Sequence, residues 1–178
     1  MDDVLNLIPL LGPVPQADTS RIGMYGGSRG GLMTYLALAR TDRIQAVVVR
    51  AGASDLIAGL RERPDLEKLY AELIPDYGAR KDDELRARSP VLWADKLNPK
   101  TPILLMQGTA DWRVSPDEGF AMAEALYRAK HPFRLVMFEG GSHGLPEFRG
   151  KLYRLTIDWF NTYLRDGKQW PSLEKHGE

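Results

Sequence analysis

Four short apolar segments stand out along the chain, separated by longer stretches in which apolar and charged residues follow other spacings. They cover residues 21–25, 45–50, 102–107 and 134–139. The second holds three valines in a row, from Val47 to Val49, and the third runs without a break from Ile103 to Met106. Uninterrupted apolar runs of this kind are typical of strands that are buried on both faces. We therefore predict four strands.

Amphipathic stretches lie before, between and after these strands. We predict helices at residues 2–11, 30–40, 65–93, 115–130 and 148–165. In the last of them Leu152, Leu155 and Trp159 recur at the spacing that places side chains on one helical face. Strands that alternate with helices favour a parallel sheet built from right-handed crossovers. The predicted fold class is α/β, with a mainly parallel sheet of about four strands flanked by helices.

Several of the predicted helices carry boundary signals. Gly12 follows the first helix, and Gly167 follows the last. Ser115 and Glu118 have the spacing of a capping box, with Pro116 at the first helical position, so a helix is expected to begin there. These signals fix where the predicted helices should begin or end.

The charged stretch at 65–93 is the longest insertion between two strands. Its apolar residues form one stripe that includes Leu66, Leu69, Tyr70 and Leu73. A helix packed on the surface explains this pattern. Since the insertion follows the carboxyl end of a strand, where α/β folds bind ligands, it could also overhang a site.

Composition narrows the class of protein. The chain has 178 residues and is 43% hydrophobic, which suits a single domain covering residues 1–178. Lys plus Arg and Asp plus Glu both total 24, so the net charge predicts neither a nucleic-acid partner nor an acidic membrane partner. The acidic start after Met1 and the lack of a long apolar run predict a soluble protein. The absence of cysteine fits a reducing compartment, so we expect a cytoplasmic location.

A candidate nucleophile lies between the first strand and its helix. Gly26-Gly27-Ser28-Arg29-Gly30 matches the pattern G-x-S-x-G, in which a strained turn presents a serine hydroxyl above a sheet. The glycines are expected because side chains would clash in that turn. A dinucleotide phosphate loop is the alternative, with Ser28 at the position of its middle glycine, where a side chain would obstruct the pyrophosphate.

A serine nucleophile needs an imidazole base that is oriented by a carboxylate. Asp111 follows the third strand, and His143 follows the fourth within a glycine-framed loop, so both are expected at the active edge of the sheet. Asp111 could instead stabilise its own turn, and His143 could be an ordinary loop histidine. Asp55, after the second strand, is a rival acid.

The remaining chemistry-bearing residues predict no cofactor. The chain has three histidines at no ligand spacing and no cysteine, so we expect no metal site. A Gly-Lys-Ser or Gly-Lys-Thr phosphate loop is absent from the sequence. His131 lies near the end of a predicted helix, where a positive charge suits the helix dipole, and needs no catalytic explanation.

Four segments together resemble the prolyl oligopeptidase family of serine peptidases, within the α/β-hydrolase superfamily. They are residues 21–31 (RIGMYGGSRGG), 88–90 (RSP), 108–114 (GTADWRV) and 142–144 (SHG). The resemblance covers roughly residues 2–165 and implies Ser28 as the nucleophile, Asp111 as the acid and His143 as the base. These are the residues that the chemistry of the motifs favours.

The resemblance also implies that this chain corresponds to the C-terminal part of a catalytic domain, without the family's earlier strands or β-propeller. The backbone N–H of Arg29 is then the one expected oxyanion donor, which predicts low activity. We expect small acyl esters or short peptides as substrates. A catalytically silent, self-associating module is the rival hypothesis. The first strand should be an open sheet edge, which predicts a homodimer or a higher homo-oligomer.

Overall fold

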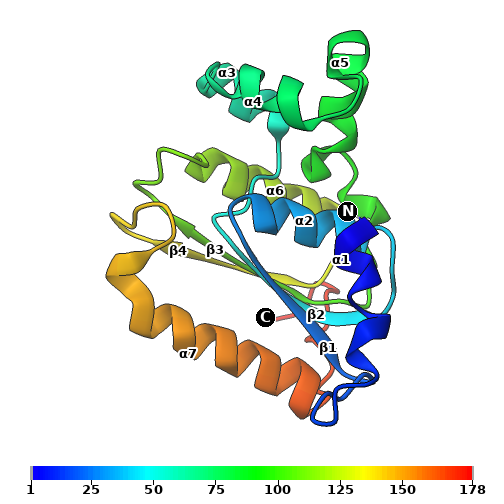
Figure 1. Ribbon diagram of the computed structural model, residues 1–178. Helices are drawn as coiled ribbons and strands as arrows, with labels where there is room; N and C mark the ends of the chain where they lie inside the picture. Colours follow the sequence, from blue (N-terminus) through cyan, green and yellow to red (C-terminus); the bar gives the residue numbers. More distant parts are fainter. Residues whose placement is uncertain (1, 178) are drawn as a thin grey trace.

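The computed structural model describes residues 2–177, so Met1 of the acidic start lies outside the described residues. A parallel sheet forms the centre of the fold (Figure 1). The strands are β1 (Ile22–Gly27), β2 (Ile44–Arg50), β3 (Ile103–Gly108) and β4 (Phe133–Phe138). They lie in the order β1-β2-β3-β4, and each pairs in parallel with its neighbour. The α/β class and the four predicted strands are confirmed. Among the described residues β1 has a strand partner on one side only, so the predicted edge position of β1 is confirmed.

Helices cover both faces of this sheet. They are α1 (Asp2–Asn6), α2 (Arg29–Leu38), α3 (Leu56–Glu62), α4 (Leu66–Leu73), α5 (Tyr77–Ala87), α6 (Pro116–Arg128) and α7 (Arg149–Phe160). Short 3₁₀ turns occupy Pro9–Leu11, Pro90–Leu92, Ala94–Lys96 and Pro146–Phe148, and a π-helical turn continues α7 over Asn161–Arg165. Figure 1 shows α2 and α6 on one face and α7 on the other.

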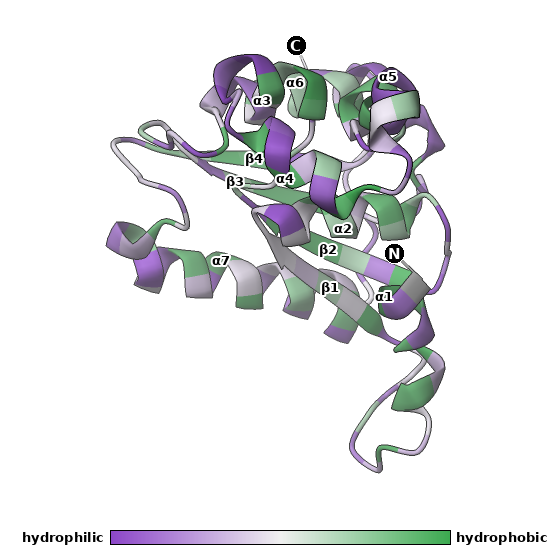
Figure 2. Ribbon diagram, turned by 45° about the horizontal axis from the view of Figure 1, so that its top comes forward, coloured by the Kyte–Doolittle hydropathy of each residue, from purple (hydrophilic) through white to green (hydrophobic). Residues whose placement is uncertain are grey.

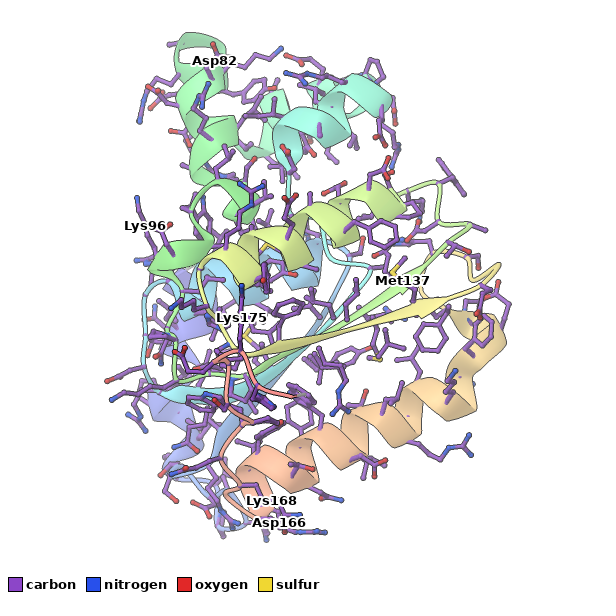
Figure 3. All side chains as sticks on the ribbon, turned by 180° about the vertical axis from the view of Figure 1, so that it is seen from behind. Asp82, Lys96, Met137, Asp166, Lys168 and Lys175 are labelled. Carbon is purple, nitrogen blue, oxygen red and sulfur yellow. The ribbon has the colours of Figure 1, made fainter. Side chains whose placement is uncertain are left out.

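Two apolar clusters result from this layering. Val47 and Val49 of β2 pack with α2 and α6, whereas Ala46 and Val48 pack toward α7 with Trp159. Both faces of β2 are therefore buried, as the valine run predicts. Figure 3, which views the molecule from behind, shows side chains filling the space between the sheet and α7, with Met137 near the end of β4.

The first predicted helix is shorter than the sequence pattern suggests. It ends at Asn6, and a separate 3₁₀ turn begins at Pro9. Proline has no N–H to donate, and its ring clashes with the carbonyl four residues earlier, so the helix cannot continue. The apolar face is nevertheless as expected, because Leu5 and Ile8 are half-buried.

The predicted helical stretch at 65–93 contains two helices, α4 and α5, and a 3₁₀ turn, and a further helix, α3, precedes it from Leu56. Asp76 adopts a left-handed conformation with φ 56° and separates α4 from α5. These helices form an additional layer over α2, through a cluster of Leu32, Leu56, Ile74, Tyr77 and Leu85. In Figure 2 the ribbons of this layer carry both hydrophilic and hydrophobic residues, and Leu69 and Leu73 of α4 are exposed. The insertion also reaches a loop at the carboxyl edge of the sheet, where the Arg63 guanidinium lies 5.2 Å from the ring centroid of Trp112.

The capping box predicted at Ser115 is half right. Ser115 caps α6 by accepting a hydrogen bond from the amide of Asp117, and the helix begins at Pro116 as expected. The side chain of Glu118 does not return to Ser115. Its Oε2 accepts hydrogen bonds from the amides of Ser54 (2.8 Å) and Asp55 (3.0 Å). A buried pair of backbone donors therefore outcompetes the local cap.

His131 also differs from its predicted environment. It is buried, and its Nε2 donates to the carbonyl of Thr101 at 2.8 Å. Burial lowers the pKa of His131, so the ring is neutral at pH 7 and supplies no positive charge to the helix dipole. Among residues 2–177, no helix has the length and apolar character needed to span a bilayer.

Candidate active site

Ser28 occupies the turn that joins β1 to α2. Its φ of 55° and ψ of −124° lie in a region that non-glycine residues rarely adopt, at a cost of about 1–3 kcal/mol. The turn is held by the Ser28 amide, which donates to the carbonyl of Arg50 at 3.0 Å, and by the Ser28 carbonyl, which accepts from Gly31 at 2.9 Å. This conformation is the strained strand-to-helix turn that the G-x-S-x-G motif predicts.

The glycines in and beside the motif differ in what a side chain on them would meet. A Cβ on Gly26 would lie 2.2 Å from the carbonyl oxygen of Gly30, and a Cβ on Gly31 would lie 2.5 Å from the Cα of Gly52. A Cβ on Gly30 would have no neighbour within 4 Å. The prediction that a side chain would clash is therefore wrong for Gly30. The close approach of helix and strand occurs one residue later.

Gly27 lies beside a residue that the sequence analysis missed, whose side chain would have to shift to admit a Cβ. A Cβ there would lie 2.5 Å from Nη2 of Arg50. The same guanidinium donates through Nη1 to the carbonyl of Gly144, at 2.7 Å. One side chain thus touches the residue before Ser28 and the residue after His143. Arg50 is the polar end of an apolar run, and nothing in the local pattern indicates where its side chain points.

Asp111 and His143 lie together at the carboxyl edge of the sheet. Nδ1 of His143 is 2.9 Å from Oδ2 and 3.1 Å from Oδ1 of Asp111. The Asp111 side chain is fully buried, whereas 16% of the His143 side chain is exposed. Oδ1 of Asp111 also accepts from the amides of Arg113 and Val114, at 2.9 and 3.1 Å. The carboxylate therefore stabilises its own turn and also contacts the histidine.

Backbone contacts hold the two loops in register. The amide of Thr109 donates to the carbonyl of Phe138, and the amide of Ala110 donates to the carbonyl of Gly141, both at 3.0 Å. Gly108 allows this contact, since a Cβ on it would lie 2.1 Å from the Gly141 oxygen. The separation of acid and base is thus set by the sheet and not by the side chains alone.

Within the described residues, the Ser28 hydroxyl has no hydrogen bond to the His143 ring. Such bonds often tighten only when substrate is present. The amide of Arg29, the first of α2, has no acceptor in the described part of the chain and points from a helix N-terminus. A carbonyl oxygen beside Ser28 could accept a hydrogen bond from it.

Asp55, the rival acid, makes no hydrogen bond to His143 among the described residues. It caps α3, and its Oδ1 accepts from the amides of Ile57 and Ala58 at 3.0 Å. Over residues 2–177, no cluster of three histidine, aspartate or glutamate side chains could hold a metal ion.

Comparison with known proteins places the chain in a family. Residues 1–167 match the prolyl oligopeptidase family. An uncharacterized peptidase of Bacillus subtilis, YuxL, is 30% identical over 156 residues, which are 84% of this chain and 23% of that protein. The acylamino-acid-releasing enzyme of Mus musculus is 27% identical over 158 residues, 83% of this chain and 21% of the mouse protein.

Solved structures show the same fold. An acylaminoacyl peptidase of Pyrococcus horikoshii superposes with a TM-score of 0.82 at 27% identity, covering 96% of this chain and 28% of that one. A puromycin-hydrolyzing peptidase of Mycobacterium tuberculosis gives a TM-score of 0.76 at 30% identity, covering 91% and 25%. The chain thus spans about a quarter of these relatives. It belongs to the prolyl oligopeptidase family of serine peptidases and has the α/β-hydrolase fold of their catalytic part.

Proposed function

We propose that the chain is a serine hydrolase that cleaves small acyl esters or peptide-like substrates through an acyl-enzyme on Ser28. The contact between Asp111 and His143 Nδ1 is the observation that carries this proposal. A proton on Nδ1 that is donated to Asp111 leaves Nε2 as the base, which is the tautomer that catalysis needs.

The reaction follows from these roles. The Ser28 oxygen attacks the substrate carbonyl while His143 accepts the hydroxyl proton, and the negative charge moves to the carbonyl oxygen beside the Arg29 amide. His143 then returns the proton to the leaving alcohol or amine, which departs. Water, deprotonated by the same imidazole, attacks the acyl-enzyme and releases the acid and free Ser28.

Low turnover is part of the proposal. The fold's oxyanion hole uses two N–H donors, and the nucleophile turn supplies one of them, the Arg29 amide. Loss of one such donor costs roughly a hundredfold to a thousandfold in the rate constant. The relatives' names describe release of acylamino acids and hydrolysis of puromycin, which supports acyl transfer from small substrates as the broad chemistry.

Covalent labelling tests the proposal. A fluorophosphonate probe should label wild-type protein at Ser28, and p-nitrophenyl butyrate should be hydrolysed. The variant Ser28→Ala should lose both signals while it remains folded by circular dichroism. If wild-type protein resists the probe at millimolar concentration, the rival hypothesis of a catalytically silent module replaces this one.

We propose further that the chain self-associates through β1. Among the described residues β1 has no strand partner on one side, and it carries Tyr25, which is 45% exposed. Unpaired N–H and C=O groups along an edge favour pairing with another chain, and a two-fold dimer is the simplest closed arrangement. Light scattering with gel filtration at micromolar concentration should give at least twice the monomer mass, and a stable monomer would contradict this.

A further inference from the structure

Arg50 has an unusual environment for a cation. It ends β2 on the face that packs toward α7, and it is half-buried. Its Nε is buried and has no hydrogen-bond partner, and across residues 2–177 no carboxylate forms an ion pair with it. A guanidinium that is partly removed from water without a counter-charge costs free energy. The guanidinium makes one short hydrogen bond, in which Nη1 donates to the Gly144 carbonyl at 2.7 Å.

The space for this guanidinium is made by glycines. Gly27 lies against its Nη2 and Nε, where a Cβ would come within 2.5 and 3.0 Å. A Cβ on Gly144 would come within 3.3 Å of Nη1. The planar side chain therefore fills the gap between the nucleophile turn and the histidine loop. Its backbone adds to this, because the Arg50 carbonyl accepts from the Ser28 amide.

His143 lies between two anchored carbonyls. On one side, the Gly141 carbonyl accepts from the Ala110 amide of the Asp111 loop. On the other side, the Gly144 carbonyl accepts from Arg50. The loop needs such anchors, since Gly140 and Gly144 have φ of 68° and 87° and glycine restricts its backbone least.

We propose that Arg50 is a positioning residue that fixes the histidine loop relative to the nucleophile turn. The inference rests on the proposed function, because it assigns His143 as the base. Arg50 acts through the Gly144 carbonyl and does not touch substrate. Its planar fork suits a contact with two neighbours, which a lysine ammonium reproduces only in part.

Single variants test the role of the side chain. Arg50→Met keeps the length and removes every donor, and it should lower kcat about 10- to 100-fold with KM changed less than twofold, because a small misplacement of a catalytic group costs up to about a hundredfold. Arg50→Lys should recover part of the loss. Arg43→Met is the matched control, since Arg43 precedes the same strand and donates to the Thr19 carbonyl at 3.2 Å, and it should keep wild-type kcat.

A second measurement does not depend on activity. Hydrogen exchange of peptides covering residues 139–148 should become at least threefold faster in Arg50→Met, with β3 unchanged. The double variant Gly27→Ala/Arg50→Met should have nearly the same kcat as Arg50→Met alone. A Cβ at position 27 clashes with the Arg50 guanidinium, and Arg50→Met has already removed that group.

The outcomes separate the two proposals. Wild-type protein that resists the fluorophosphonate probe refutes the proposed function, whereas exchange at 139–148 still tests the anchor. If wild-type protein is labelled and Arg50→Met matches it in labelling rate and in exchange, the positioning role is overturned. If the losses in kcat of the two single variants multiply in the double variant, the contact between Gly27 and Arg50 is not the basis of the positioning role.

Discussion

Replacing Glu118 by glutamine should stabilise the protein at neutral and alkaline pH. Only 6% of this residue is exposed, and burial raises its pKa from 4.5 to about 7, against the opposing effect of the hydrogen bonds from Asp55 and Ser54. The folded state therefore holds a proton that the unfolded state releases between these two values. The contribution of Glu118 to stability is fully present below pH 4.5 and is lost as the pH rises through 7, by about 3 kcal/mol in total.

Glutamine keeps an oxygen that can accept from the two amides and carries no charge at any pH. The difference in unfolding free energy between Glu118→Gln and the wild type should therefore rise by about 2–3 kcal/mol from pH 5 to pH 8. Urea denaturation at fixed protein concentration measures this difference, because the m-value should stay constant.

The control for Glu118→Gln lies on the same helix. Glu124 is exposed and pairs with Arg128, and Glu124→Gln should change stability by less than about 0.5 kcal/mol at either pH. A difference between Glu118→Gln and the wild type that does not vary with pH would refute the reasoning, since it would mean that Glu118 titrates alike in the folded and unfolded states.

Three further predictions follow from the site and its surroundings. His131→Gln should flatten the loss of stability on the acid side, because the lowered pKa of His131 means that the unfolded state binds the extra proton as the pH falls below 6.5; unfolding between pH 7 and pH 5 measures it. Gly31→Ala should lower stability by about 1–3 kcal/mol through overpacking, while Gly30→Ala should be neutral or stabilising; thermal unfolding compares the pair, and equal melting temperatures would contradict it. Asp111→Asn should lower kcat on the order of 10⁴-fold with little change in fold, because the amide favours the wrong imidazole tautomer; steady-state hydrolysis of p-nitrophenyl butyrate checks this.

The sequence predicts those features whose causes are local. The valine run of β2 predicts a strand with two buried faces, and the glycines around Ser28 predict a strained turn. Strand order also puts Asp111 and His143 at one edge, where the structure has them in contact. These features need only the periodicity of the chain and the parallel arrangement of its strands.

Two residues escape such reasoning because their partners are far away in the chain. Arg50 binds a carbonyl 94 residues later, and Glu118 binds amides 64 and 63 residues earlier. Locally, Glu118 fits a capping box and Arg50 fits a strand end. Which contact prevails depends on donors that the fold brings near, and a one-dimensional pattern carries no information about them.

The helical insertion that contains α3–α5 leaves and rejoins the sheet at nearly one point. The amide of Val91 donates to the carbonyl of Ser54 at 3.1 Å, and the amide of Leu56 donates to the Ser89 hydroxyl at 3.0 Å. Residues 56–88 therefore form a closed excursion that is pinned at its base and packs on α2 through a shared apolar cluster. Segments of this kind can be exchanged between relatives without cutting the sheet. Natural or engineered replacement of the excursion would change what approaches Trp112, the residue after Asp111, while Ser28, Asp111 and His143 stay in place.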